Sequence, residues 1–159
     1  MTGAVKPVPE HLHTVTPRLV FAGEGSKALA FYEQAFGAEA LGPPVQTPDG
    51  NVIHAEIRIG DSVVYVTDEG DGEGVAPASV KRQVTAVMAL TIPDVDTLWN
   101  RAVDAGCEVI YPLADHFYGD RGGRLRDPFG HQWMLSTHIE DVDPDEMERR
   151  MAEMMNDAG

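Results

Sequence analysis

Apolar and polar positions follow the same succession of patterns twice along the chain. In the first half, a strand-like segment over residues 15–21, which ends in Leu, Val and Phe, precedes Leu29, Tyr32 and Phe36. These three recur at helical spacing, and alternating positions follow over residues 52–59. Spacing of three to four residues places side chains on one face of a helix, and alternation is typical of a half-buried strand. The first half is therefore predicted to run strand, helix and then three strands.

Capping and turn residues mark the ends of these elements. Ser26 is a suitable N-cap for the first helix, and Gly37 is a suitable residue to end it in the left-handed conformation. Turns are predicted at residues 48–50, where Pro, Asp and Gly are adjacent, and at Gly60. The predicted elements are a strand over residues 15–21, a helix over 26–36, and strands over 38–41, 52–59 and 62–67.

The second half repeats this order at an offset of 69 residues, which carries Phe36 onto Ala105 and Gly37 onto Gly106. Such self-similarity predicts two structurally similar modules. Asp94 is the predicted N-cap of the second helix, which ends at Gly106. The predicted elements are a strand over residues 85–92, a helix over 95–105, and strands over 108–112, 117–126 and 132–137.

Composition outside and between the two modules sets the predicted domain boundaries. Residues 1–13 contain two prolines and are predicted to form a flexible N-terminal arm, in which His11 and His13 are a chance or solvated pair. Residues 14–142 form one domain, with modules at 14–68 and 84–139 and an acidic, Gly-rich linker at 69–83. Residues 143–159 form a C-terminal helix and tail.

The C-terminal helix has a clear start signal and an apolar stripe. Asp143 is a suitable N-cap, and Pro144 follows it at the first helical position. Methionines recur at i, i+4, i+7 and i+8, at positions 147, 151, 154 and 155. This stripe predicts either packing against a sheet or a partner subunit, or an adaptable lid over a ligand.

The net charge of the chain argues against some classes of binding partner. The 159 residues contain 12 Lys and Arg against 26 Asp and Glu, a formal charge of −14. This balance argues against a nucleic-acid partner, because such binding depends on basic side chains that neutralise phosphates. It also argues against docking on an anionic membrane. The apolar run at 84–92 is too short to span a bilayer, and the single Cys107 favours a reducing cytoplasm.

Four segments together carry a resemblance to a known family. They read AFYEQAFGA at 30–38, HAEIRIGDS at 54–62, FYGDR at 117–121 and DPFGHQW at 127–133. The chain resembles the vicinal oxygen chelate superfamily of glyoxalases, bleomycin-resistance proteins and extradiol dioxygenases, near its PhnB-like branch, over residues 14–142. The resemblance implies an α+β fold of paired βαβββ modules forming a cup-shaped mixed sheet, with a homodimer as the assembly.

The same resemblance identifies four positions at which metal-dependent members carry His or Glu ligands. In this chain they fall on Pro17, on Val64 or Tyr65, on Val87 (or Ala86 in a shifted register), and on Met134. These side chains do not suit a hard divalent ion. We therefore expect no metal and no other cofactor.

A polar group on one predicted strand offers different chemistry. His54, Glu56 and Arg58 alternate and so share one face, while Ile53, Ala55, Ile57 and Ile59 share the other. The polar face is predicted to line the cup. It is either a wall whose side chains satisfy one another, an acid/base pair, or part of a displaced metal site completed by a group such as His116.

The segment 116–126 combines aromatic rings with arginines that can stack on or clamp a ligand. The alternative is a loop ion pair between Asp120 and Arg121 with surface arginines around it. Trp133 and Met134 point to opposite faces; the family register turns Met134 to the cup, and a slip of one residue would turn Trp133 there. The candidate contacts are His54, Glu56, Tyr65, Phe117, Tyr118, Arg124 and Trp133.

These observations favour one function and leave a second open. The first is a cytoplasmic, metal-independent homodimer that sequesters an aromatic compound or antibiotic in the cup. The alternative is an enzyme of the lyase, isomerase or dioxygenase kind, with His54 and Glu56 as acid and base or as a displaced metal site.

Overall fold

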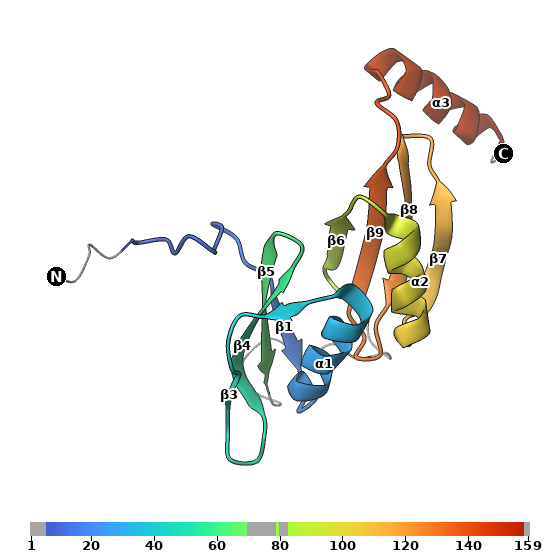
Figure 1. Ribbon diagram of the computed structural model, residues 1–159. Helices are drawn as coiled ribbons and strands as arrows, with labels where there is room; N and C mark the ends of the chain where they lie inside the picture. Colours follow the sequence, from blue (N-terminus) through green and yellow to red (C-terminus); the bar gives the residue numbers. More distant parts are fainter. Residues whose placement is uncertain (1–5, 70–78, 80–82, 158–159) are drawn as a thin grey trace. The chain divides into compact units, whose positions relative to one another are not determined.

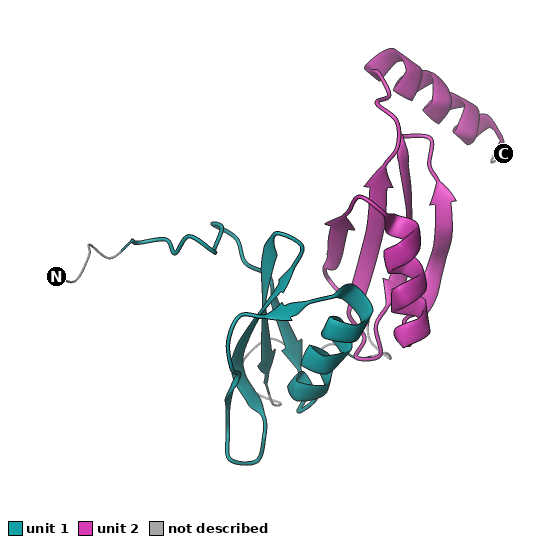
Figure 2. Ribbon diagram, in the orientation of Figure 1, with its two compact units in different colours: residues 1–82 teal, residues 83–159 magenta. Residues whose placement is uncertain are grey.

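The computed structural model describes residues 6–69, 79 and 83–157, so most of the predicted linker 69–83 lies outside the described residues. The chain divides into two compact units, residues 1–82 and 83–159 (Figure 2). Each unit contains one mixed sheet and one helix packed on it (Figure 1). The α+β fold of two βαβββ modules and a C-terminal helix is thereby confirmed.

The first unit contains a sheet in the order β1-β5-β4-β2, with the short β3 also paired to β4. Strand β1 is parallel to β5, and the other pairs are antiparallel. Helix α1 packs on β4 and β5 (Figure 1). The elements are β1 (Arg18–Phe21), α1 (Gly25–Phe36), β2 (Glu39–Ala40), β3 (Val45–Gln46), β4 (Val52–Ile59) and β5 (Ser62–Asp68).

The start of α1 differs from the prediction. Glu24, not Ser26, is the N-cap residue, and its side chain makes no capping hydrogen bond. The carboxylate of Asp68, at the end of β5, accepts hydrogen bonds from the backbone N–H of Gly25 at 2.9 Å and of Val52 at 2.8 Å. A residue 43 positions away therefore satisfies the first turn. The predicted end at Gly37 is confirmed, with φ 66°.

The second unit contains a sheet in the order β6-β9-β8-β7, with β6 parallel to β9. Helix α2 packs on β7 and β9. The predicted cap is confirmed, because Asp94 accepts a hydrogen bond from the Thr97 N–H at 3.1 Å. The elements are β6 (Val87–Thr91), α2 (Val95–Ala105), β7 (Glu108–Asp115), β8 (Asp120–Arg126), β9 (Gln132–His138) and α3 (Pro144–Asp157).

Strand β7 is longer than predicted. It continues past Pro112 to Asp115, and its ladder with β8 shifts register on either side of Tyr111. Proline has no N–H to donate to a ladder, so such irregularities are where a strand tolerates it. The register shifts, and not the extension, place Tyr111 opposite Arg124 on β8.

Helix α3 begins where predicted, with the Asp143 carboxylate accepting from the Glu146 N–H at 3.0 Å. None of its residues is buried. Arg150 attaches it to the unit by donating to the Phe117 carbonyl at 3.1 Å and to the Glu140 carboxylate at 2.7 and 2.9 Å. Within the described parts of the chain, no helix is long and apolar enough to cross a membrane.

Candidate functional site

In the first unit, three predicted site residues meet on the face of the sheet opposite α1. His54 Nε2 lies 3.2 Å from Glu56 Oε1, and the His54 ring lies 4.9 Å from the Tyr65 ring. Glu56 and Tyr65 are cross-strand partners on β4 and β5, which places their side chains on the same face. His54 and Glu56 are thus within reach for a proton to pass between them.

The N-terminal arm contributes to this group, which the sequence analysis did not predict. His11 Nε2 donates to Glu56 Oε2 at 3.2 Å, so imidazoles contact both oxygens of the carboxylate. Arg58 pairs with Glu39 at 2.5 Å instead of with its strand neighbours. A cavity of about 320 Å³ lies beside the group and is lined by His11, Leu41, Gly42, Pro43, His54, Ala55 and Glu56.

One part of the predicted alternation on β4 is wrong. Ile53 is 53% exposed, and Val52 is fully buried in its place. The ladder between β3 and β4 shifts register here, pairing Val45 with His54 and Gln46 with Val52. A two-against-one pairing of this kind breaks the alternation of side chains locally. Ala55, Ile57 and Ile59 remain buried, as predicted.

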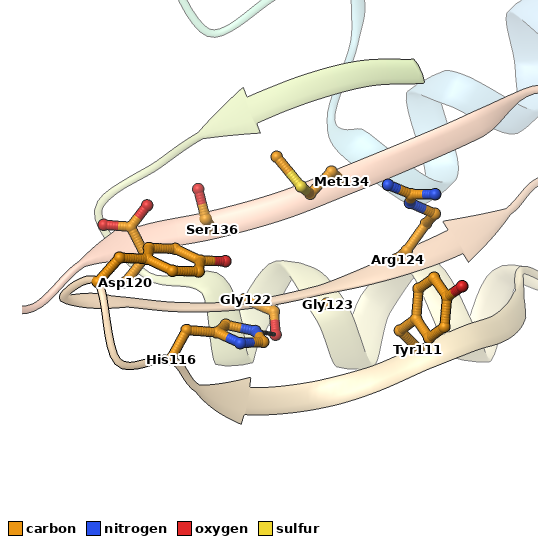
Figure 3. Close-up of a pocket in the computed structure, with 9 residues that line it drawn as sticks. Tyr111, His116, Asp120, Gly122, Gly123, Arg124, Met134 and Ser136 are labelled. Atoms are coloured by element: carbon orange, nitrogen blue, oxygen red, sulfur yellow. Dashed lines mark hydrogen bonds between the residues drawn. The ribbon is translucent and has the colours of Figure 1, made fainter. Parts of the chain in front are cut away.

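In the second unit, a pocket of about 220 Å³ lies on the face opposite α2. Arg124 and Met134 are cross-strand partners there, and Gly122 and Ser136 form the next such pair. Figure 3 shows Tyr111, Arg124 and Met134 around one end of the pocket and His116 and Asp120 around the other. The lining residues are Tyr111, His116, Tyr118, Asp120, Gly122, Gly123, Arg124, Met134 and Ser136.

Arg124 is the basic group of this pocket. Its guanidinium carbon lies 5.4 Å from the centre of the Tyr111 ring, a cation–π distance. Its Nε atom is buried and has no hydrogen-bond partner among the described residues. Ion pairs are formed instead by Arg18, Arg58, Arg121, Arg126, Arg149 and Arg150.

The far wall of the pocket is aromatic. The rings of His116 and Tyr118 are stacked, with centres 5.1 Å apart and planes within 2°. His116 Nε2 lies 3.0 Å from the carbonyl oxygen of Gly122 (dashed in Figure 3). Because a carbonyl only accepts, Nε2 carries the proton, and Nδ1 of the neutral ring is an acceptor. The wall thus offers both a flat surface and a polar atom.

Asp120, at the same end, is held by a histidine. His138 Nδ1 lies 2.7 Å from Asp120 Oδ1, and His138 Nε2 lies 2.9 Å from Asp141 Oδ1, so the protonated ring donates to both carboxylates. Hydrogen bonds to Asp120 and then to Asp141 raise the pKa of His138 above its usual 6.5. When His138 is protonated, it offsets the negative charge that Asp120 brings to the pocket.

The structure separates the predicted contacts of this segment. Tyr118 and Arg124 line the pocket, whereas the Phe117 ring packs on Tyr118 at 5.4 Å and does not line it. The prediction for Trp133 requires correction, because its side chain is 0% exposed and its Nε1 donates to Asp127 Oδ2 at 2.9 Å. Alternation along β9 turns Met134, 37% exposed, into the pocket instead.

Tyr111 lines the pocket without having been a predicted contact. It lies near the end of the strand predicted over 108–112 and shares no motif with the other candidates. Its role follows from the irregular β7–β8 pairing that places it opposite Arg124. The one signal in the sequence that could have indicated Tyr111 is the predicted hairpin between its strand and the strand of Arg124, since cross-strand partners share a face.

The positions at which the family resemblance implies metal ligands do not fit a divalent ion. Pro17 offers only its carbonyl, which accepts from the Tyr65 N–H at 2.9 Å, and Met134 offers a thioether. Over residues 6–69, 79 and 83–157, no group of three or more His, Cys, Asp and Glu side chains is arranged to hold an ion. We derive no metal chemistry from this site.

Comparison with known proteins identifies the family. The family model described as Glyoxalase/Bleomycin resistance protein/Dioxygenase superfamily matches residues 11–135. The chain belongs to this superfamily. An uncharacterized protein of Mycobacterium bovis is 37% identical over 142 residues, which cover 87% of this chain and 91% of the relative.

Solved structures of the superfamily have the same fold. TioX from Micromonospora sp. ML1 aligns with a TM-score of 0.57 and 25% identity over 79% of this chain and 99% of TioX. A PhnB protein of Bacillus cereus aligns with a TM-score of 0.62 and 19% identity, over 79% of this chain and 99% of the neighbour. At that identity the second likeness supports the fold alone.

Proposed function

We propose that this superfamily member binds a small, planar aromatic molecule, without metal, in the pocket on the second sheet. The observation that carries the proposal is the pocket between Tyr111 and the stacked His116–Tyr118 pair, on the face opposite α2. Tyr111 and Tyr118 are 60% and 40% exposed. Ligand pockets combine such apolar surfaces with a few polar groups that fix orientation.

The composition of the pocket supports an aromatic rather than an aliphatic ligand. Met134 offers a polarizable thioether that adapts to a ring, and Tyr111 and Tyr118 offer ring faces. Gly122 leaves this part of the floor without a side chain, so a flat molecule approaches the backbone of β8 closely. Sequestration of such a compound requires only affinity and slow release, with no reacting group.

The proposal includes a homodimer and a cytoplasmic location. The family resemblance supports the dimer, and static light scattering of the full chain tests it: a dimer mass is expected, and a monomer mass at all micromolar concentrations would contradict it. Cys107 supports the location, because it is 6% exposed and burial raises the pKa of its thiol to about 12. A buried, protonated thiol does not serve as an oxidised cross-link.

A neutral aromatic probe tests the proposed binding. We expect 2-naphthamide to bind the full chain saturably by calorimetry and to show ligand-observed saturation transfer. Replacing Tyr118 by Ala removes one wall and is expected to weaken binding about 3- to 10-fold, since an aromatic pair contributes about 0.5–1.5 kcal/mol.

A matched tyrosine in the other unit provides the control. Tyr65→Ala removes a ring beside His54 and should leave the affinity for 2-naphthamide unchanged. Loss of binding in Tyr65→Ala with full binding in Tyr118→Ala would move the site to the first unit and overturn the proposal.

A further inference from the structure

We propose that the molecule bound in this pocket is an aromatic anion whose carboxylate is held side-on by Nε and one terminal nitrogen of Arg124. This inference rests on the proposed function, because it concerns the same pocket, and it names the chemical class of the ligand. It depends on the charge balance around Arg124, the orientation of its guanidinium and the state of the opposite wall.

The chain around Arg124 has a large excess of negative charge. Carboxylates outnumber basic side chains in this chain by 14, and six described arginines are paired with carboxylates. Among the described residues, Arg124 pairs with none, although it lies in a pocket where a carboxylate has room. An arginine left without a carboxylate amid this excess is suited to an anion that comes from outside the chain.

The guanidinium of Arg124 is held in one orientation. The Tyr111 ring packs on the Arg124 guanidinium at 5.4 Å and restricts its rotation. Nε is buried without a partner among the described residues, and leaving a buried donor unpaired is unfavourable. A carboxylate that accepts from Nε and from a terminal nitrogen together satisfies this donor in the bidentate geometry that guanidinium prefers.

Arg126, two residues along the same strand, shows that a buried Nε alone is not sufficient. Its Nε is also without a hydrogen-bond partner among the described residues, but its Nη1 donates to Glu108 at 3.0 Å. Arg126 does not line the pocket. The charge of Arg126 is therefore already neutralised, and the residue serves as a matched control.

The opposite wall of the pocket must tolerate an anionic ligand. Asp120 is the carboxylate that lines the pocket, and His138 donates to it at 2.7 Å. His116, whose Nε2 is taken by the Gly122 carbonyl, presents its ring at that end, and the Ser136 hydroxyl is available as a donor or an acceptor. The pocket thus has a cation at one end and hydrogen-bonding groups at the other, which suits an aromatic acid with its carboxylate toward Arg124.

A pair of probes that differ only in charge tests the inference. Calorimetric titrations of the full chain at pH 7 compare 2-naphthoate with 2-naphthamide. We expect 2-naphthoate to bind at least tenfold more tightly. Arg124→Gln should abolish that difference by weakening 2-naphthoate while leaving 2-naphthamide within about twofold. Arg124→Lys, which keeps the charge but loses the fork of donors, should recover only part of it.

The controls separate failure of the inference from failure of the proposed function. Arg126→Gln makes the same change of charge on the same strand and should keep the full preference for 2-naphthoate. Equal affinity of the two probes for the unmodified chain would overturn the anion inference and leave aromatic binding intact. Binding of neither probe would overturn both. Each variant is shown to be folded by a denaturant midpoint, followed by tryptophan fluorescence, that matches the midpoint of the unmodified chain. If Arg124→Gln is not folded, Arg124→Lys replaces it.

Discussion

Replacing Asp127 by Ala is expected to destabilise the second unit strongly, because this carboxylate joins β8 to β9. Asp127 is 1% exposed. Its Oδ1 accepts from the backbone N–H of Phe129 and of His131, both at 3.0 Å, and its Oδ2 accepts from Trp133 Nε1 at 2.9 Å. These bonds fix the turn that sets Arg124 opposite Met134 across the hairpin. The pocket depends on that register.

The size of the destabilisation depends on which of the three donors can form hydrogen bonds with water after the substitution. The indole N–H of Trp133 lies on a side chain that is 0% exposed, so it stays unpaired, at a cost of about 1–3 kcal/mol. The two backbone donors are nearer the surface and recover part of their loss by hydration. A total of about 3 kcal/mol is expected, which lowers the urea midpoint by about 2 M at an m-value of about 1.5 kcal/mol/M.

Tryptophan fluorescence is the suitable assay, because both tryptophans of the chain, Trp99 and Trp133, lie in the second unit. Asp127→Asn keeps the shape but turns an amide N–H toward one of the three donors. Replacing Trp133 by Phe in the Asp127→Asn background removes one of these donors. The loss of unfolding free energy in the double variant should therefore be smaller, by at least about 1 kcal/mol, than the sum of the losses in the two single variants. A urea midpoint for Asp127→Ala within about 0.3 M of that of the unmodified chain, a loss of only about 0.5 kcal/mol, would show that Asp127 does not hold the turn in this way.

Three further outcomes are expected. Gly123→Ala should lower the fluorescence midpoint by about 1 M through overpacking, because a Cβ there would lie 2.6 Å from the Trp99 ring; Gly42→Ala, with no neighbour within 4 Å, should not change it. The raised pKa of His138 adds stability that is complete below pH 6.5 and is lost as the pH rises through that pKa. The melting temperature should therefore fall over that pH range, and His138→Gln should remove this fall. Arg150→Gln should speed hydrogen exchange across α3 without moving the fluorescence midpoint, because α3 buries no residue.

The sequence predicted the order of elements because local signals set most of it. Helix α2 begins after Asp94 and α3 begins after Asp143, as their capping residues indicate. The start of α1 was wrong, because its first turn is satisfied by Asp68 from β5, a contact with no local signal. The two-residue β3 was not predicted for the same reason, since its pairing with β4 involves a register shift.

The site was only partly predictable for a related reason. Tyr118 and Arg124 were recognisable from their chemistry, but Tyr111 joins them only through an irregular hairpin ladder. Trp133 and Met134 are neighbours in sequence, and a register error of one residue exchanges their faces. The contact between His11 and Glu56 spans 45 residues and involves an arm whose sequence predicts no order.

Methyl NMR reports directly on whether an aromatic ligand occupies the pocket beside Met134. The full chain, labelled with ¹³C at the methionine methyl groups, is titrated with 2-naphthoate, and Met134→Leu assigns the resonance. We predict that the Met134 signal moves saturably under the ring current of the ligand, while the signals of Met151 and Met154 on α3, which do not line the pocket, stay in place. A stationary Met134 signal at ligand concentrations that saturate calorimetric binding would contradict the account.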